Sequence, residues 1–281
     1  MERPVWLLLL VLFAFAAWGR GQGRSEVEPS NSWHTAVNFM REPYIRRAEQ
    51  GGGAEKERSG DELGTGEAEL PDANGPRFHW HPALAQSMIF LGIQHGFRML
   101  APKTRDELGG PFFKDWMKSE KNMRGWEDGD SGFTNYVSHP LQGALTGRIF
   151  VNNSDAAKAQ EFGPSKEYWN SRLKAMLWST FWSTQYELGP ISEASIGNVG
   201  LRDHNGHCTM AYVDLVITPT VGTAVLIGED AIDRYLLKHG IEKDTTNKRT
   251  VAIMRTLLTP TTSTANVLRG KKPWKRDDRP L

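Results

Sequence analysis

Cysteine is almost absent from this chain: among 281 residues only Cys208 carries a thiol, so an internal disulfide is excluded. The chain also lacks an excess of charge of either sign, because its formal net charge is +1. This balance argues against a nucleic-acid partner. The H-E-x-x-H, G-x-S-x-G and Walker signatures are missing, as is any cysteine zinc site. Packing must supply the stability, and no familiar motif identifies a reaction.

The first residues contain an apolar run. Residues 6–18, WLLLLVLFAFAAW, suit the hydrophobic region of a signal peptide and fall short of the roughly 20 residues of a membrane span. Small residues lie at the end of this run and just after it, at Ala14, Ala16, Ala17 and Gly19. We predict a signal peptide at 1–21 and an exported protein, periplasmic or envelope-associated. An uncleaved membrane anchor is the alternative.

Two segments lack the apolar content of a folded core. Residues 22–77 are predicted to be a flexible tether, because the glycine-rich, charged run 50–76 cannot bury enough surface to offset its ordering entropy. Residues 271–281 form a basic tail around Trp274. A tail of this kind suits an anionic membrane surface or another envelope component as partner, and a solvated tail is the alternative.

Residues 78–270 are predicted to form a single all-α domain. Apolar side chains recur at steps of three or four, the spacing of one helix face, and we expect these faces to turn inward. The first such set is Leu84, Met88, Leu91, His95 and Met99, and the second is Trp169, Leu173, Met176, Leu177 and Thr180. The run 209–217 is the single stretch that competes as a strand, because it is rich in β-branched residues.

The segment 208–228 raises the question of a membrane. It has 21 residues and a single charge, Asp214, and its length fits a bilayer. Thr218 and Pro219 fall near its middle, and a charge within a membrane is costly. We expect two buried helices, broken at Thr218–Pro219, in a soluble core. A membrane-embedded segment is the alternative.

Glu229 is the carboxylate with the clearest apolar surroundings. It shares a helical stripe with Val225, Ile232 and Leu236. A buried carboxylate needs a partner, and we predict that Glu229 lies buried near His139. The alternative is a buried ion pair with Arg148 or Arg172.

His139 stands before Pro140, which favours extended geometry just ahead of a helix. The positive end of a helix dipole favours neutral imidazole, the form that binds metals or accepts protons. Glu187 is the second candidate, since it lies five helical turns after Trp169 and shares its face. His139, Glu187 and Glu229 are therefore the candidate catalytic residues. A capping histidine and a solvated Glu187 are the alternatives.

Three further residues complete a predicted polar centre. Asp214 interrupts an apolar run, Glu193 lies just after Gly189–Pro190, and His95 falls on the apolar stripe of its helix. A cap at the helix break for Asp214, a helix cap for Glu193 and a hydrogen-bonded core position for His95 are the alternatives. No cofactor or metal is specified by these residues.

The blocks NYVSHPLQGALTGRIFVNN and YWNSRLKAMLWSTFWSTQYELGPISEASIGN, with a later GED, resemble an uncharacterised bacterial family. Members of this domain-of-unknown-function family share an N-Y-x-x-H-P-x-x-G block and a downstream E…PSIND-like segment. The resemblance points to His139, Pro140, Gly143, Glu187, Ser192, Gly228 and Glu229. Val199 stands where the family has an aspartate. The family implies an exported, envelope-associated protein without an established activity.

The sequence therefore favours an exported, envelope-associated helical protein, with a structural or interaction role built on a buried His/carboxylate centre. A hydrolase acting on lipid or another envelope component is the alternative. It would use His139 with Glu187 and Glu229.

Overall fold

The computed structural model describes residues 76–100, 105, 110–123, 125–126, 130–196 and 212–281. The predictions for the signal peptide, for nearly all of the tether and for Cys208 lie outside the described residues. Within those ranges every regular element is a helix and there is no strand, so the all-α prediction is confirmed.

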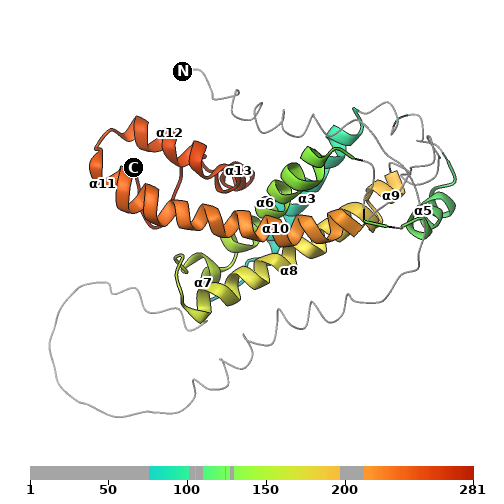
Figure 1. Cartoon of the computed structure of the whole chain (residues 1–281), viewed down its shortest axis with the longest axis horizontal. Coiled ribbons are helices and arrows are strands. Elements are labelled where there is room, and N and C mark those ends of the chain that lie inside the picture. Colours follow the sequence, from blue (N-terminus) through green and yellow to red (C-terminus); the bar gives the residue numbers. More distant parts are fainter. Residues whose placement is uncertain (1–75, 101–104, 106–109, 124, 127–129, 197–211) are drawn as a thin grey trace, which may run out of the picture. The chain divides into compact units, whose positions relative to one another are not determined.

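The longer helices are α3 (Trp80–Arg98), α5 (Phe112–Lys121), α6 (His139–Asn152), α8 (Lys166–Leu188), α10 (Tyr212–Ala231), α12 (Lys248–Leu258) and α13 (Pro260–Leu268). Shorter helices are α7 (Asp155–Lys158), α9 (Glu193–Ile196) and α11 (Glu242–Asp244), and the π-helical turns are η1 (Thr134–Ser138) and η2 (Ile232–Ile241). α6 is the central helix, and α3, α8, α10 and α13 all pack against it (Figure 1).

Side-chain pairs fix the direction of each helix. Gln86 near the start of α3 pairs with Asn153 just after α6, and Gln94 further along α3 pairs with Gln142 near the start of α6. α3 therefore runs against α6. α8 runs against α10, since Arg172 reaches Asp230 near the end of that helix. The bundle thus has a His139 end and an Asn153 end.

α6 and α10 approach one another closely because their contact is made of glycine. A Cβ added at Gly143 would overlap the carbonyl oxygen of Thr218. A Cβ at Gly222 would lie 2.8 Å from the backbone nitrogen of Ala144. Gly147, one turn after Gly143, gives α6 the G-x-x-x-G spacing that allows two helix backbones to touch.

α10 continues through Pro219, so the predicted break into two helices is wrong. Proline removes one hydrogen bond from a helix interior and usually kinks or ends it. In α10 the adjoining turn is held by α6, because Gly143 makes room for the Thr218 carbonyl. The tertiary contact therefore offsets the local preference of proline.

His139 is helical, with φ −63° and ψ −45°, and the expected extended geometry is wrong. The π-helical turn η1 leads directly into α6 without an intervening loop. A π-helical turn hydrogen-bonds to the fifth residue and so departs from the regular ladder, and it often occurs at functional positions. His139 thus enters the bundle from within a continuous helix.

The predicted apolar faces of α3 and α8 are exposed over part of their length. On α3, Leu84, Met88 and Ile89 are 43%, 47% and 52% exposed, while Gln86 and Gln94 are buried. On α8, Trp169 and Leu173 are exposed. Leu91 and His95 of the first set are buried, so the expectation that these stripes form the core holds only in part. The helix contacts combine large apolar residues with small and polar side chains.

Residues 271–281 are part of the helical domain. Arg276 is buried and its Nε donates to Asp233 at 2.7 Å, and Arg279 donates to Asp233 and Glu242 at 2.6 and 2.8 Å. The expected separate basic tail therefore packs onto η2 and α11, because the carboxylates there neutralise its arginines.

Candidate functional site

Three buried residues from three helices come together at the His139 end of the bundle. His139 begins α6, Glu187 is the next-to-last residue of α8, and Asp214 lies in the first turn of α10. Their ligand atoms all lie within 4.8 Å of one another. We call these residues the His139 group. Two of the three candidate catalytic residues belong to it, and Asp214 takes the place expected for Glu229.

The imidazole of His139 is held on its Nδ1 side. Nδ1 lies 3.4 Å from Oδ1 of Asp214 and 3.3 Å from Oγ1 of Thr218, one turn further along α10. Ser183 on α8 donates to the backbone carbonyl of Asp214 at 3.3 Å, which ties α8 to the same turn. The group is therefore positioned by side chains from all three helices.

One imidazole and two carboxylates form a donor set for a divalent cation. Zinc accepts histidine nitrogen and carboxylate oxygen, and manganese and iron accept the same ligand types. Two carboxylates this close in a buried site disfavour each other's charged form, and a cation would relieve that repulsion. The residues therefore fit a metal centre at the His139 end.

Glu193 and His95 belong to a neighbouring group. Glu193 lies 3.1 Å from Nη2 of Arg98 and accepts a hydrogen bond of 2.8 Å from the hydroxyl of Tyr186. His95 stacks on Tyr186 at 4.9 Å, and its Nε2 lies 3.0 Å from the Ile191 carbonyl. Glu193 is ion-paired, while Ser192 and Ser195 cap the start of α9. Arg98, the cation in this group, was not among the sequence candidates.

Glu229 is buried, as predicted, but it holds a different helix end. Its carboxylate accepts hydrogen bonds from the backbone nitrogens of Thr261 and Thr262 at 2.7 and 3.0 Å, and from the Thr262 hydroxyl at 2.7 Å. Arg148 lies 3.8 Å away. Glu229 therefore caps the N-terminus of α13 beside a weak ion pair, and it is eleven residues along α10 from Thr218, roughly 16 Å of helix.

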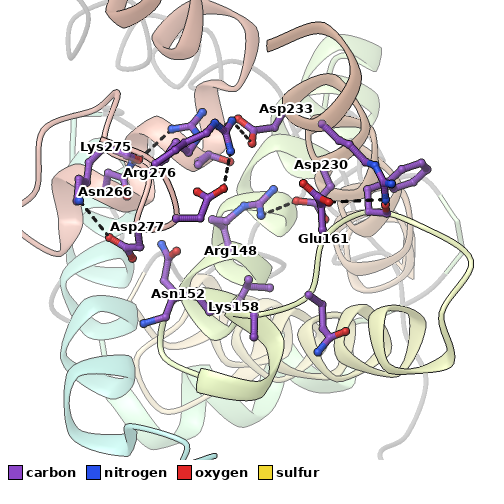
Figure 2. Close-up of a pocket in the computed structure, with 18 of the residues that line it drawn as sticks. Arg148, Asn152, Lys158, Glu161, Asp230, Asp233, Asn266, Lys275, Arg276 and Asp277 are labelled. Atoms are coloured by element: carbon purple, nitrogen blue, oxygen red, sulfur yellow. Dashed lines mark hydrogen bonds and ion pairs between the residues drawn. The ribbon is translucent and has the colours of Figure 1, made fainter. Parts of the chain in front are cut away.

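A charged pocket of about 380 Å³ opens at the Asn153 end of the bundle (Figure 2). Its lining comes from α6, α7 and the segment after it, α8, α10, η2, α13 and the last residues of the domain. Nine cations line it: Arg148, Lys158, Arg172, Arg234, Lys238, Arg269, Lys275, Arg276 and Arg279. Five carboxylates accompany them: Glu161, Asp230, Asp233, Asp277 and Asp278.

No family model, curated protein or solved structure matches the chain. The resemblance to an uncharacterised bacterial family therefore stays a prediction. Of the residues that it picks out, His139 and Glu187 lie in the His139 group, and Gly143 lies at the contact of α6 with α10.

Proposed function

We propose that the protein is an envelope-associated membrane protein whose helical bundle is embedded in lipid and built around the His139 group. The observation that carries this proposal is the apolar outer surface of α3 and α10, combined with polar and charged side chains that lie buried among the apolar residues of the core. The outer face of a helix in a soluble protein is instead polar and charged.

α3 gives the clearest case. Its exposed positions from Leu84 to Gly96 are Leu84, Ala85, Met88, Ile89, Gly92 and Gly96, none of them charged. Its buried positions include Gln86, Ser87, Gln94, His95 and Arg98. Polar groups that face neighbouring helices while apolar groups face outward are the pattern of helices in lipid.

α10 repeats the pattern. Its exposed positions are Tyr212, Val216, Thr220, Val221, Ala224 and Gly228, and its buried ones include Asp214, Thr218 and Glu229. Within the described residues, the helical stretch Tyr212–Asp244 is the one long and apolar enough to cross a membrane by length and composition. α8 carries the half-buried Lys174, whose long stem lets its charge reach toward a helix end.

Aromatic side chains lie at both ends of the exposed apolar surface. Trp80, Trp169 and Tyr235 are exposed at the Asn153 end. Trp126, Tyr136 and Tyr212 are exposed at the His139 end, where Trp126 donates a hydrogen bond of 3.1 Å to Tyr136. Tryptophan and tyrosine concentrate at the two membrane–water interfaces. At 1.5 Å per residue, the 19 residues of α3 span roughly 28 Å, close to the thickness of a bilayer core.

Two exposed methionines provide a matched test of lipid embedding. Met88 lies on the outward face of α3, and Met117 lies on α5 with a similar exposure. In lipid, Met88→Lys should cost about 2.5–3.5 kcal/mol and reduce the protein recovered in the membrane fraction, while Met117→Lys should not. The wild-type protein should stay in the membrane fraction during extraction with alkaline carbonate and should be extracted by detergent. Release by carbonate, or equal recovery of both variants, would contradict the proposal.

The second candidate function is a metal-dependent hydrolase acting on a lipid or another envelope component. The His139 group favours it, because a bound divalent cation lowers the pKa of water and polarises an ester or phosphoryl oxygen. His139, Glu187 and Asp214 would hold the ion. Glu229, which the sequence predicted as a third catalytic residue, instead accepts hydrogen bonds from the start of α13.

Metal analysis of purified protein tests this second function. His79 and Asp155 form an exposed pair at 2.9 Å, which makes a matched control for His139 and Asp214. His139→Gln and Asp214→Asn should lose a stoichiometric metal that His79→Gln and Asp155→Asn retain. Wild-type protein that takes up no metal, even after incubation with zinc or manganese, would leave the His139 group as a purely structural centre.

A further inference from the structure

We propose that the charged pocket at the Asn153 end binds a phosphate-bearing ligand. The arginines and lysines that line the pocket outnumber its carboxylates and would hold the phosphate group. The proposal is independent of the His139 group, which lies at the other end of the bundle.

The first observation is the excess of positive charge. Nine cations against five carboxylates leave the lining with a net charge of +4. The carboxylates are shared: Asp230 serves Arg148 and Arg172 at 2.7 Å each, and Asp233 serves Arg276 and Arg279 at 2.7 and 2.6 Å. Glu242, outside the lining, is a further partner of Arg279 at 2.8 Å. A phosphate group would supply the negative charge that this sharing leaves short.

The second observation is a set of donors without acceptors. Within the described residues, three buried donor atoms on the lining lack a hydrogen-bond partner: Asn152 Nδ2, Arg148 Nε and Arg234 Nε. Buried donors normally have partners, and each one left unsatisfied costs free energy. A phosphate group offers oxygen acceptors and no donor when fully ionised, so its chemistry matches the donors on the lining.

Crowding of cations around the pocket agrees with this assignment. Burial lowers the pKa of Arg276, and the charges of Arg279 and Arg255 lower it further against the effect of Asp233. Although burial alone would raise the pKa of Asp277, the hydrogen bond and charge of Arg269, with Lys158 and Lys275, bring it below its ordinary value. An anion in the pocket would ease the repulsion among these cations.

The size of the pocket indicates more than free phosphate. Its 380 Å³ lies in the range of roughly 300–1,000 Å³ that small-molecule sites occupy. A phosphate monoester, either a soluble metabolite or the head group of a lipid, shares the required chemistry. Arginine is suited to bind it, because the guanidinium presents two parallel donors to phosphate oxygens.

Asparagine variants give a matched test. Asn152 lines the pocket, and Asn170 lies exposed on α8 outside it. Binding of glycerol 3-phosphate to the full-length protein in detergent is measured by calorimetry. Asn152→Asp, which places a carboxylate in the pocket at unchanged side-chain size, should weaken binding about tenfold or more, whereas Asn170→Asp should bind like the wild type.

A second pair covers the case in which Asn152→Asp fails to fold. Lys158→Glu removes an exposed pocket cation, and Lys166→Glu changes an exposed lysine outside the pocket. The same titration with a short-chain phosphatidic acid in place of glycerol 3-phosphate separates the two sources, since a lipid ligand should bind more tightly than its head group alone. Wild-type protein that binds neither compound, or equal affinities within both pairs of variants, would overturn the proposal.

Discussion

At the scale of single residues, the buried carboxylates of this protein divide by partner. Asp230 and Glu193 neutralise arginines, Glu229 receives the backbone of a helix end, and Asp214 faces His139. A carboxylate that accepts several hydrogen bonds is stabilised in its charged form, because each donor replaces the water lost on burial. The contribution of each buried carboxylate to stability therefore depends on the group that it contacts.

Glu229→Ala should lower the free energy of unfolding by about 2–4 kcal/mol, because it leaves the first backbone nitrogens of α13 and the nearby Arg148 without their carboxylate. Glu229→Gln should cost less, since its amide oxygen still accepts one of these hydrogen bonds. Denaturant unfolding measures both, with Glu167→Gln on the exposed face of α8 as control. An unchanged midpoint for Glu229→Ala would be inconsistent with the cap.

Glu242 should contribute to acid sensitivity. Burial alone would raise its pKa, but hydrogen bonds and charges from Arg255 and Arg279 lower it to about 2. The folded-state pKa is therefore below the unfolded one, so the stabilisation is complete above about pH 4.5 and is lost as the pH falls toward 2.

Glu242→Gln should consequently be less stable than the wild type at pH 7, and the difference should shrink on acidification through this range. Thermal melts at several pH values measure it, with Glu167→Gln again as control. Parallel stability curves for the wild type and Glu242→Gln between pH 5 and 3 would count against the ion pairs.

At the scale of helices, the sequence predicted where elements lie better than how they face. The stop at Gly189–Pro190 ends α8 as expected, and the periodic run from Leu84 to Met99 is α3. The inward face was predicted only in part: Leu91 and His95 of the α3 stripe are buried, but Leu84 is exposed. The spacing of apolar residues within one helix therefore does not determine which of its faces packs against the other helices.

The distant partners also escaped prediction. Burial of Glu229 followed from its stripe, but its cap lies 32 residues further along the chain, on a helix whose packing no local pattern describes. Asp214 was recognised as a polar residue in an apolar run, and its contact with His139 depends on the two glycine-lined helices meeting at that turn.

Gly143→Ala should separate α6 from α10, because the added methyl group overlaps the backbone carbonyl of Thr218, which cannot rotate away. We expect a loss of at least about 3 kcal/mol, or failure to fold. Gly92→Ala on α3 is the control, since nothing lies near its Cβ position. It should be neutral or stabilise by up to about 1 kcal/mol. Thermal melts in detergent give both values, and equal melting temperatures would refute the contact.

At the scale of the whole molecule, two polar centres lie at opposite ends of one bundle. The His139 group gathers carboxylates around an imidazole, and the charged pocket gathers cations around a cavity (Figure 2). The central helix α6 reaches both, since it begins with His139 and contributes Arg148 and Asn152 near its other end. The His139 end is therefore suited to a cation, and the Asn153 end is suited to an anion.

Removal of residues 271–281 should destabilise the domain as a whole. Arg276 and Arg279 would no longer neutralise Asp233 and Glu242, and the wall of the charged pocket would be lost. We expect a lower melting temperature and faster proteolysis of α12 and α13. Lys271→Ala with Lys272→Ala, which changes exposed lysines of the same segment, is the control. A truncated protein that melts like the full chain would show that the segment is dispensable.

The position of Arg276 in the chain has a consequence for biosynthesis. Asp233 and Arg276 are 43 residues apart, so at 5–20 residues per second the arginine is made about 2–9 s after its carboxylate. Asp233 can pair with Arg276 only after both residues have left the ribosome, so the helices made first fold without this ion pair. Released chains that are truncated before Arg276 should therefore be degraded faster than chains that extend past Arg279.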